Sequence, residues 1–179
     1  VRVDSESIFN EMKDFADRFV PHISPTIEHY ADERPIFDLY SVEGEIERAL
    51  EREVPLKSGG YLIIDQTEAM TTIDVNTGAY VGHRNLEETS LRTNLEAAMV
   101  VARQLRLRNL GGIIVIDFID MLEEEHRQQV LQELAGGLSG DHAKTQIMSV
   151  SSLGLVEMTR KRNRESLEHI LCQTCPSCE

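Results

Sequence analysis

The stretch from Gly60 to Asp120 decides the fold, because it holds two apolar runs that each contain or end in an acidic residue. Short, β-branched, apolar runs bounded by glycine are typical of strands in a sheet covered on both faces. The helical pattern between the runs then predicts an α/β layer. The first run is Tyr61-Leu62-Ile63-Ile64-Asp65, a short link and Met70-Thr71-Thr72-Ile73-Asp74-Val75-Asn76, and the second is Gly112-Ile113-Ile114-Val115-Ile116-Asp117-Phe118.

The segments between and after these runs extend the same layer. The link Gln66-Thr67-Glu68 is short enough for an antiparallel hairpin. Residues 145–150 predict a further strand, whereas residues 153–158 fit a strand or a helix. The fold class is therefore α/β, a mixed sheet with flanking helices.

Two helices are expected between the strands. Asn85, with Glu88 three residues later, forms a capping box for a helix that runs to about Arg108. Asp120, with Glu123 three residues later, is expected to cap the second helix in the same way. The first helix is expected to bury a stripe made of Leu91, Leu95, Ala98, Met99, Ala102 and Leu105.

The first part of the chain predicts a smaller unit. Asp4 or Ser5 is expected to cap a helix that ends before Pro21, and Val42 to about Glu53 predicts another helix. Proline and glycine between residues 55 and 60 mark a break, so we expect a subdomain boundary there.

Two aspartates form a candidate cation site. Side chains alternate along a strand, so Asp74 and Asn76 share one face, and an aspartate that ends a strand enters the crevice beyond the sheet edge. If the two strands are neighbours, Asp74 and Asp117 face the same small volume. Two carboxylates, an amide and water suit Mg²⁺. The alternative is that both aspartates only cap the turns after their strands.

The composition limits the partners. The 179 residues are 41% apolar and 27% charged, and their formal net charge of −13 argues against a general electrostatic grip on nucleic acid. Local basic groups are Arg103, Arg106, Arg108 and the run 160–164. No apolar run is long enough to span a bilayer. The start, Val1-Arg2-Val3-Asp4, is not a signal peptide, and we expect the chain to be a piece of a longer protein.

All three cysteines lie at the end of the chain, at Cys172, Cys175 and Cys178. Their absence elsewhere indicates a reducing compartment, which predicts a cytoplasmic location. A Cys-x-x-Cys pair suits tetrahedral zinc, which needs four ligands. Two chains that share one ion, a closed site in one chain with Cys172 and His169, an iron–sulfur site, and a tail without metal all remain open.

Several segments form a recognisable set: Gly59-Gly60-Tyr61, Ile64 to Ala69, Ile73 to Gly78, Asn94 to Ala97, Ala102 to Gly112, Ile116 to Met121, Gly154 to Arg160 and Cys175-Pro176-Ser177-Cys178. Together these segments resemble the ribonuclease E/G family. The tail at 159–162 and the turn at 83–86 resemble its ribonuclease G branch more than its ribonuclease E branch.

The resemblance implies an Mg²⁺-dependent endoribonuclease that cuts single-stranded RNA, favouring 5′-monophosphorylated substrates. It leaves 5′-phosphate and 3′-hydroxyl ends, in rRNA processing and mRNA decay. Asp74 and Asp117 would be the catalytic aspartates that hold Mg²⁺, and Asn76 would assist them. Cys175 and Cys178 would bind a Zn²⁺ shared between two chains, which implies a homodimer or a higher oligomer.

The same resemblance implies a division of the chain. Residues 1–52 would be part of a ribonuclease H-like subdomain, 53–168 a DNase I-like catalytic subdomain, and 169–179 the zinc-link segment. The family's oligonucleotide-binding barrel and 5′-sensor would lie outside this chain, so its own activity is expected to be weak. The alternatives are a zinc-linked dimerisation or scaffold module without catalysis, and a phosphatase-like enzyme for small phosphoesters.

Overall fold

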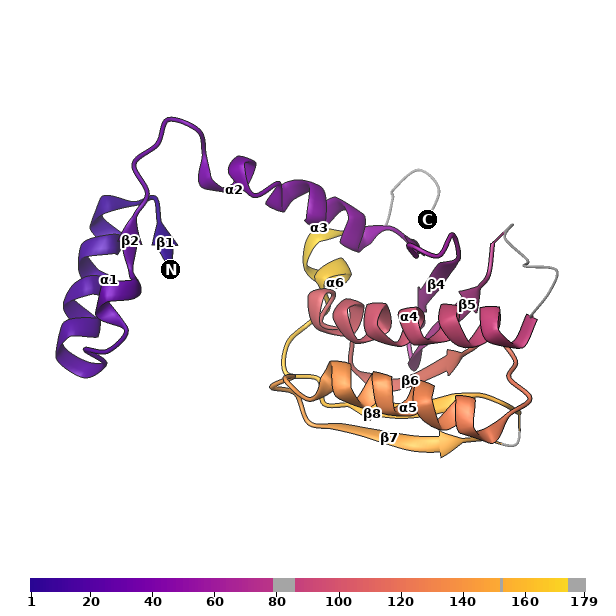
Figure 1. The fold of residues 1–179 in the computed structure, drawn as a ribbon. Helices are drawn as coiled ribbons and strands as arrows, with labels where there is room; N and C mark the ends of the chain where they lie inside the picture. Colours follow the sequence, from indigo (N-terminus) through magenta and orange to yellow (C-terminus); the bar gives the residue numbers. More distant parts are fainter. Residues whose placement is uncertain (79–85, 152, 174–179) are drawn as a thin grey trace. The chain divides into compact units, whose positions relative to one another are not determined.

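The computed structural model describes residues 1–78, 86–151 and 153–173 (Figure 1). The chain forms two compact units that divide between Glu47 and Arg48. Helix α3 (Val42–Leu50) crosses this division. Each unit is described by itself.

The first unit is small. Strands β1 (Arg2–Val3) and β2 (Glu28–His29) pair in parallel, and helix α1 (Glu6–Phe19) lies between them in the sequence. Ser5 caps α1 by accepting a hydrogen bond from the backbone N–H of Ile8, as expected, and the helix ends before the prolines. The unit also contains η1 (Ser24–Thr26) and α2 (Ile36–Leu39).

The second unit is a six-stranded mixed sheet with helices, which confirms the α/β expectation. The strand order is β3-β4-β5-β6-β8-β7; β5 and β6 are parallel, and the other neighbours are antiparallel. The expected hairpin is β4–β5. The strands are β3 (Glu53–Pro55), β4 (Tyr61–Gln66), β5 (Met70–Asn76), β6 (Gly112–Asp117), β7 (Thr145–Val150) and β8 (Val156–Arg160), and the helices are α4 (Leu86–Leu107), α5 (Glu124–Leu138) and α6 (Leu167–Leu171).

Helices α4 and α5 lie side by side over one face of this sheet (Figure 1). Burial alternates along the strands, so Ile114 and Ile116 of β6 are fully buried while Ile113 is 50% exposed. Coverage of both faces was therefore a wrong prediction for the described residues. A parallel pair inside a largely antiparallel sheet needs only one covered face, and β-branched residues also suit the open one.

The core lies between the sheet and the two helices. Small side chains on α4 allow close packing, and a Cβ at Gly137 of α5 would lie 2.8 Å from Cβ of Ala102. Met99 was wrongly placed in the buried stripe, because it is 48% exposed. Each fully buried Leu, Ile or Val contributes about 1.5–3 kcal/mol. The side chains that meet in this layer include Leu62, Ile73, Val101, Leu105, Ile114, Ile116, Val130, Leu134 and Met158.

The helix ends differ in part from expectation. Helix α4 stops at Leu107, and Asn109 makes the turn with a φ of 50° before the glycines are reached. Helix α5 has Glu123 as its N-cap, so Asp120 is not the cap. Arg127 instead holds this segment by donating two hydrogen bonds to the carbonyl of Met121. Asn85 lies outside the described residues.

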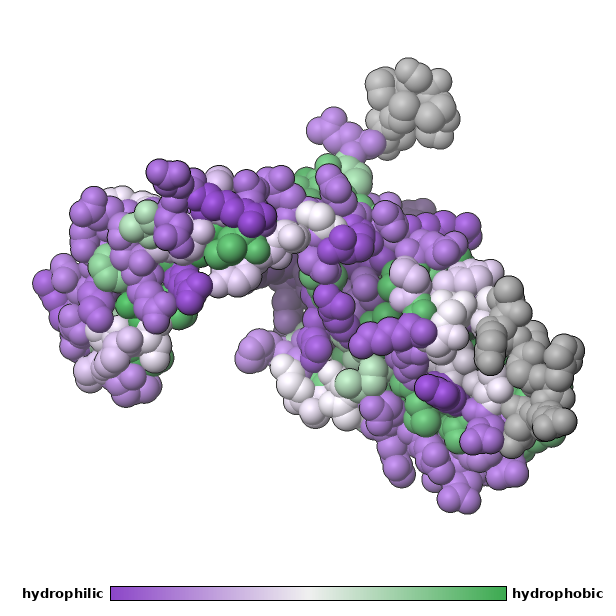
Figure 2. Space-filling model, turned by 45° about the horizontal axis from the view of Figure 1, so that its top comes forward, coloured by the Kyte–Doolittle hydropathy of each residue, from purple (hydrophilic) through white to green (hydrophobic). Residues whose placement is uncertain are grey.

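Residues 156–160 form strand β8, which settles the open choice for that segment. Hydrophilic residues cover most of the surface visible in Figure 2. Among the helices of the described chain, none combines the length and apolar character that a membrane crossing requires.

Candidate functional site: two aspartates on neighbouring strands

Asp74 and Asp117 lie directly opposite each other on the parallel strands β5 and β6. Neighbouring strands are about 4.8 Å apart, so their Cα atoms are close. The preceding pair, Ile73 and Ile116, is buried under the helices, so both aspartates point to the open face. Both are exposed. The structure therefore brings together the two carboxylates that the sequence placed at the ends of separate strands.

Asn76 lies on the same face and restrains Asp74. Its amide Nδ2 donates a hydrogen bond of 2.9 Å to Oδ2 of Asp74. An amide held in this way fixes one carboxylate oxygen and leaves Oδ1 for another partner. This is the orienting arrangement expected from strand alternation.

The carboxylate of Asp117 has a raised pKa. Partial burial raises the pKa of Asp117 above its usual range, and the charges of Asp74 and Asp120 raise this pKa further. Negative charge is thus concentrated where β5 and β6 end. A cation between the carboxylates would relieve this repulsion.

Glycines bring a neighbouring loop against the end of β5. A Cβ at Gly60 would lie 2.4 Å from the carbonyl oxygen of Asn76, and a Cβ at Gly78 would lie 2.3 Å from that of Gly59. Gly78 also has a φ of 66°, which side-chain-bearing residues rarely adopt. The Ser58-Gly59-Gly60 break is therefore part of the support of this site.

Helix α4 holds the loops around the site through polar residues that were not among the predicted site residues. Asn94 is fully buried; it accepts a 3.0 Å hydrogen bond from the N–H of Ile119 and donates one of 2.8 Å to its carbonyl. Glu96 accepts hydrogen bonds from the N–H groups of Lys57 and Ser58. A polar residue within the apolar stripe of α4 was the available signal.

Glu87, near the start of α4, ties this helix to the beginning of α5. Its carboxylate accepts hydrogen bonds from the N–H groups of Leu122 and Glu123 and pairs with Nδ1 of His126 at 2.9 Å. Together with Asn94 it fixes both ends of the segment that follows Asp117. The backbone that follows Asp117 is therefore held in place by side chains of α4.

The donor set fits a hard cation that keeps much of its water. Among the described residues there is no cluster of three or more His, Cys, Asp or Glu placed to hold a metal ion. Two carboxylates and an amide offer only a few oxygen ligands, whereas zinc sites usually include His or Cys and Ca²⁺ takes about six to eight oxygens. They match Mg²⁺, which binds through one or two carboxylates plus substrate phosphate and water.

The cysteine end is described only in part. Cys172 is exposed, and His169 has a side chain 72% exposed, 3.9 Å from Glu165. Cys175 and Cys178, the expected zinc ligands, lie outside the described residues.

The fold and its carboxylate pair define an α/β protein with a candidate cation site at the ends of two parallel strands. The chain belongs to the Ribonuclease E/G family, whose family model matches residues 1–163. The resemblance found in the sequence segments is thereby confirmed.

Individual relatives support the same branch. Ribonuclease G of Salmonella typhimurium (strain SL1344) is 62% identical over 178 residues, and ribonuclease G of Escherichia coli (strain K12) is 61% identical. Ribonuclease E of Haemophilus influenzae is 42% identical over 179 residues, which cover 19% of that protein. The match covers 99% of this chain but only 36% of the ribonuclease G relatives.

Proposed function

We propose that this chain carries the catalytic carboxylates of an Mg²⁺-dependent endoribonuclease. Its substrate is single-stranded RNA, and its products have 5′-phosphate and 3′-hydroxyl ends, in rRNA processing and mRNA decay. The observation that carries the proposal is the pairing of Asp74 with Asp117 across two parallel strands, in a chain of the ribonuclease E/G family.

The side chains would divide the work. Asp74 and Asp117 would hold Mg²⁺, which when bound activates water and stabilises the charge that develops on phosphate oxygens. Asn76 keeps Asp74 in the orientation that directs Oδ1 outward. Burial, and after it the charges of Asp74 and Asp120, raise the pKa of Asp117, and a bound cation would offset the repulsion between these carboxylates.

The test is cleavage of 5′-monophosphorylated single-stranded RNA with Mg²⁺ by the wild-type chain, Asp74→Asn and Asp117→Asn. Each change keeps the side-chain shape and removes one negative ligand, so we expect each to lower the cleavage rate at least about 100-fold. End analysis of the products checks for 5′-phosphates.

Asp65→Asn is the matched control. Asp65 lies on the same face as Asp74, opposite Thr72, but its carboxylate is paired with Arg52. We expect this variant to cleave RNA at the wild-type rate. Wild-type activity in the Asp74 and Asp117 variants would contradict the proposal, and turnover confined to small phosphoesters would indicate the phosphatase-like alternative.

We also propose that Cys175 and Cys178 contribute two thiolates per chain to a Zn²⁺ shared by two copies. Four ligands complete a tetrahedral site, so half an equivalent of zinc per chain and a dimer mass are expected. Cys175→Ser should abolish both, and Cys172→Ser should change neither. Zinc-dependent dimers without any RNA cleavage would favour the scaffold alternative.

The subdomain identities are part of the same proposal. Residues 53–168 would form the DNase I-like catalytic subdomain, 1–52 part of a ribonuclease H-like subdomain, and 169–179 the zinc link. What supports the first two assignments is family membership over residues 1–163, which does not extend to residues 169–179.

A further inference from the structure

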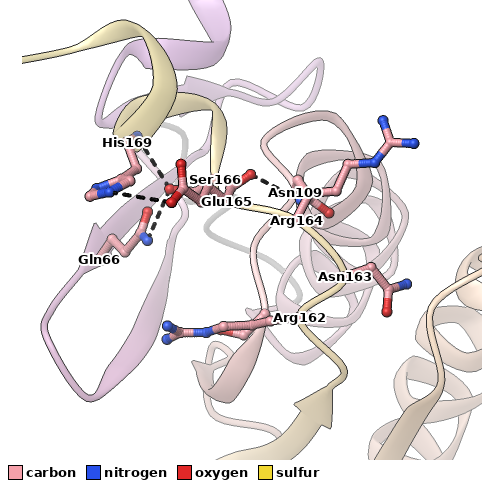
Figure 3. Close-up of a pocket in the computed structure, with 9 residues that line it drawn as sticks. Gln66, Asn109, Arg162, Asn163, Arg164, Glu165, Ser166 and His169 are labelled. Carbon is pink, nitrogen blue, oxygen red and sulfur yellow. Dashed lines mark hydrogen bonds and ion pairs between the residues drawn. The ribbon is translucent and has the colours of Figure 1, made fainter.

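Figure 3 shows a recess lined mainly by polar residues. It lies at the opposite end of the sheet from the aspartates. It has a volume of about 490 Å³ and adjoins the start of β6, whereas Asp117 ends that strand. At about 3.3 Å per residue, the five steps from Gly112 to Asp117 separate the two places by about 17 Å. The residues that matter in its lining are Gln66, Gly111, Arg162, Glu165, Ser166 and His169.

Arg162 is exposed, and its side chain is restrained by the backbone of two glycines. Its Nε donates a 2.9 Å hydrogen bond to the carbonyl of Gly111. A Cβ at Gly111 would lie 2.8 Å from Cγ of Arg162, and one at Gly112 would lie 3.0 Å from Nη2. Gly112 also has a φ of 96°. The backbone of 111–112 is therefore a floor on which only glycine leaves room for this guanidinium.

The terminal nitrogens of Arg162 remain available. Within the described part of the chain they make no hydrogen bond, and in Figure 3 the guanidinium points into the same opening as Gln66 and His169. The opposite wall is also fixed, because the buried hydroxyl of Ser166 accepts hydrogen bonds from Nε2 of Gln66 at 3.2 Å and from the N–H of His169. A held guanidinium with free Nη groups is preorganised for a planar or tetrahedral oxyanion.

Three other basic side chains of this region are already engaged, and Arg164, which also borders the recess, points away from its opening in Figure 3. Arg160 is buried and paired with Asp141 at 2.7 Å, Arg106 donates to the carbonyl of Gly137, and Arg108 is buried beside Gln104. In a chain of net charge −13, contact with a polyanion must come from such local positions. Arg162 is presented to an open recess.

We infer that this recess binds a phosphodiester of single-stranded RNA at a point away from the cleaved bond. The inference rests on the proposed function for the RNA substrate. The Nη groups of Arg162 donate to the two non-bridging oxygens, and Gln66 and His169 lie where an adjoining sugar or base would be. Glu165 opposes the anion, because its carboxylate also borders the recess.

The test is the equilibrium binding of a short fluorescent 5′-hydroxyl RNA by the 179-residue chain in buffer without Mg²⁺. No hydrolysis is needed, so failure of the aspartates to cleave RNA would leave this measurement intact. We expect Arg162→Ala to weaken binding about 10-fold and to reduce the salt dependence of log K by about 0.7, the value for one phosphate on a single strand. Arg162→Lys keeps the charge but loses the two-pronged hydrogen bonding of the guanidinium, so it should weaken binding less than Arg162→Ala does.

Lys161→Ala is the charge-matched control, because Lys161 is exposed and does not line the recess. We expect it to change the dissociation constant less than about 2-fold. Glu165→Gln should tighten binding about 2-fold, a gain that misfolding cannot produce. Equal effects of Arg162→Ala and Lys161→Ala, or no RNA binding by the unchanged chain, would overturn the inference.

The source of the phosphate is tested separately. The same loss in Arg162→Ala for 5′-hydroxyl and 5′-phosphate RNA indicates an internal diester. A loss confined to 5′-phosphate RNA would mean that the recess reads the terminal phosphate, and would overturn the assignment. Loss of self-association with unchanged RNA binding would assign the recess to contact between copies and overturn it as well.

Discussion

Asn94 offers the sharpest test of how the fold supports the carboxylate pair. Its side chain is fully buried on α4 and bonds both backbone groups of Ile119, two residues after Asp117. Asn94→Ala removes both partners at once. The N–H and the carbonyl of Ile119 are then left without the protein groups that satisfy them.

The magnitude follows from these two bonds. A hydrogen bond contributes about 1 kcal/mol net, and an abandoned buried partner costs about 1–3 kcal/mol. Ile119 is only partly buried, so water can recover some of this loss. We therefore expect Asn94→Ala to lower the free energy of unfolding by about 2–3 kcal/mol, and Tm by roughly 10 °C.

The assay is urea unfolding followed by circular dichroism, with RNA cleavage measured on the same preparations. Gln128→Ala is the control, because this exposed amide makes only a 3.5 Å contact with Glu124, and its loss should cost under about 0.5 kcal/mol. Asn94→Asp keeps the acceptor for the Ile119 N–H but replaces the donor to its carbonyl, so it should also destabilise. A loss below about 1 kcal/mol in Asn94→Ala would refute the reasoning.

Three further predictions concern charge and packing. The hydrogen-bonded guanidinium of Arg160 lowers the pKa of Asp141. The stability that this pair contributes is therefore present above about pH 4, the pKa of the carboxyl in the unfolded chain, and is lost as pH falls through the folded pKa. Asp141→Ala should lower the free energy of unfolding at pH 7 by about 3–5 kcal/mol and weaken the dependence of Tm on pH in the acid range. Gly136→Ala should raise the free energy of unfolding by up to about 1 kcal/mol, because the added Cβ meets nothing within 4 Å. In Gly137→Ala the added Cβ meets Ala102, so this variant should lose about 1–2 kcal/mol in urea unfolding. Equal effects of the two changes would contradict the observed packing of α4 against α5. The pKa of Asp117 is raised in the folded protein, so its ionised form is disfavoured and stability is lost as pH rises through that pKa. Without metal, Asp117→Asn should therefore be more stable than the wild type at pH 7 by about 0.5 kcal/mol. Added Mg²⁺ should raise Tm only in the wild type.

The placement of Asn76 on the same face as Asp74 could be predicted because strand periodicity is local. Alternation alone placed Asn76 beside Asp74, and the structure shows the hydrogen bond between them. The run ending at Asp117 could be recognised as a strand, but its register opposite Asp74 comes from a crossover through α4, whose packing the sequence does not reveal directly. The prediction that Asp74 and Asp117 face the same volume therefore depended on the assumption that their strands are neighbours.

Other features could not be predicted from the same patterns. A β-branched run such as β6 fits a sheet covered on one face or on two, because isoleucine and valine suit both environments. Asp120 matches a capping box by spacing, yet Arg127 binds the carbonyl of Met121 and the helix begins later. Cap patterns report local preference, and this segment is also held by a tertiary contact, because Glu87 of α4 accepts hydrogen bonds from the N–H groups of Leu122 and Glu123. Arg162 was visible only as part of a basic run, since Gly111 and Gly112 are distant in sequence.

Strand β6 connects the two proposed roles. Gly112 at its start forms the floor under Arg162, and Asp117 at its end faces Asp74, while Ile114 and Ile116 between them are fully buried. Such a strand keeps its register, because a shift by one residue would move the buried side chains to the open face. The separation of the phosphate recess from the carboxylates is therefore fixed by the core. An RNA strand bound at both places would be positioned by the same residues that stabilise the sheet. The fold would then set the distance between the phosphate bound at Arg162 and the cleaved phosphodiester bond.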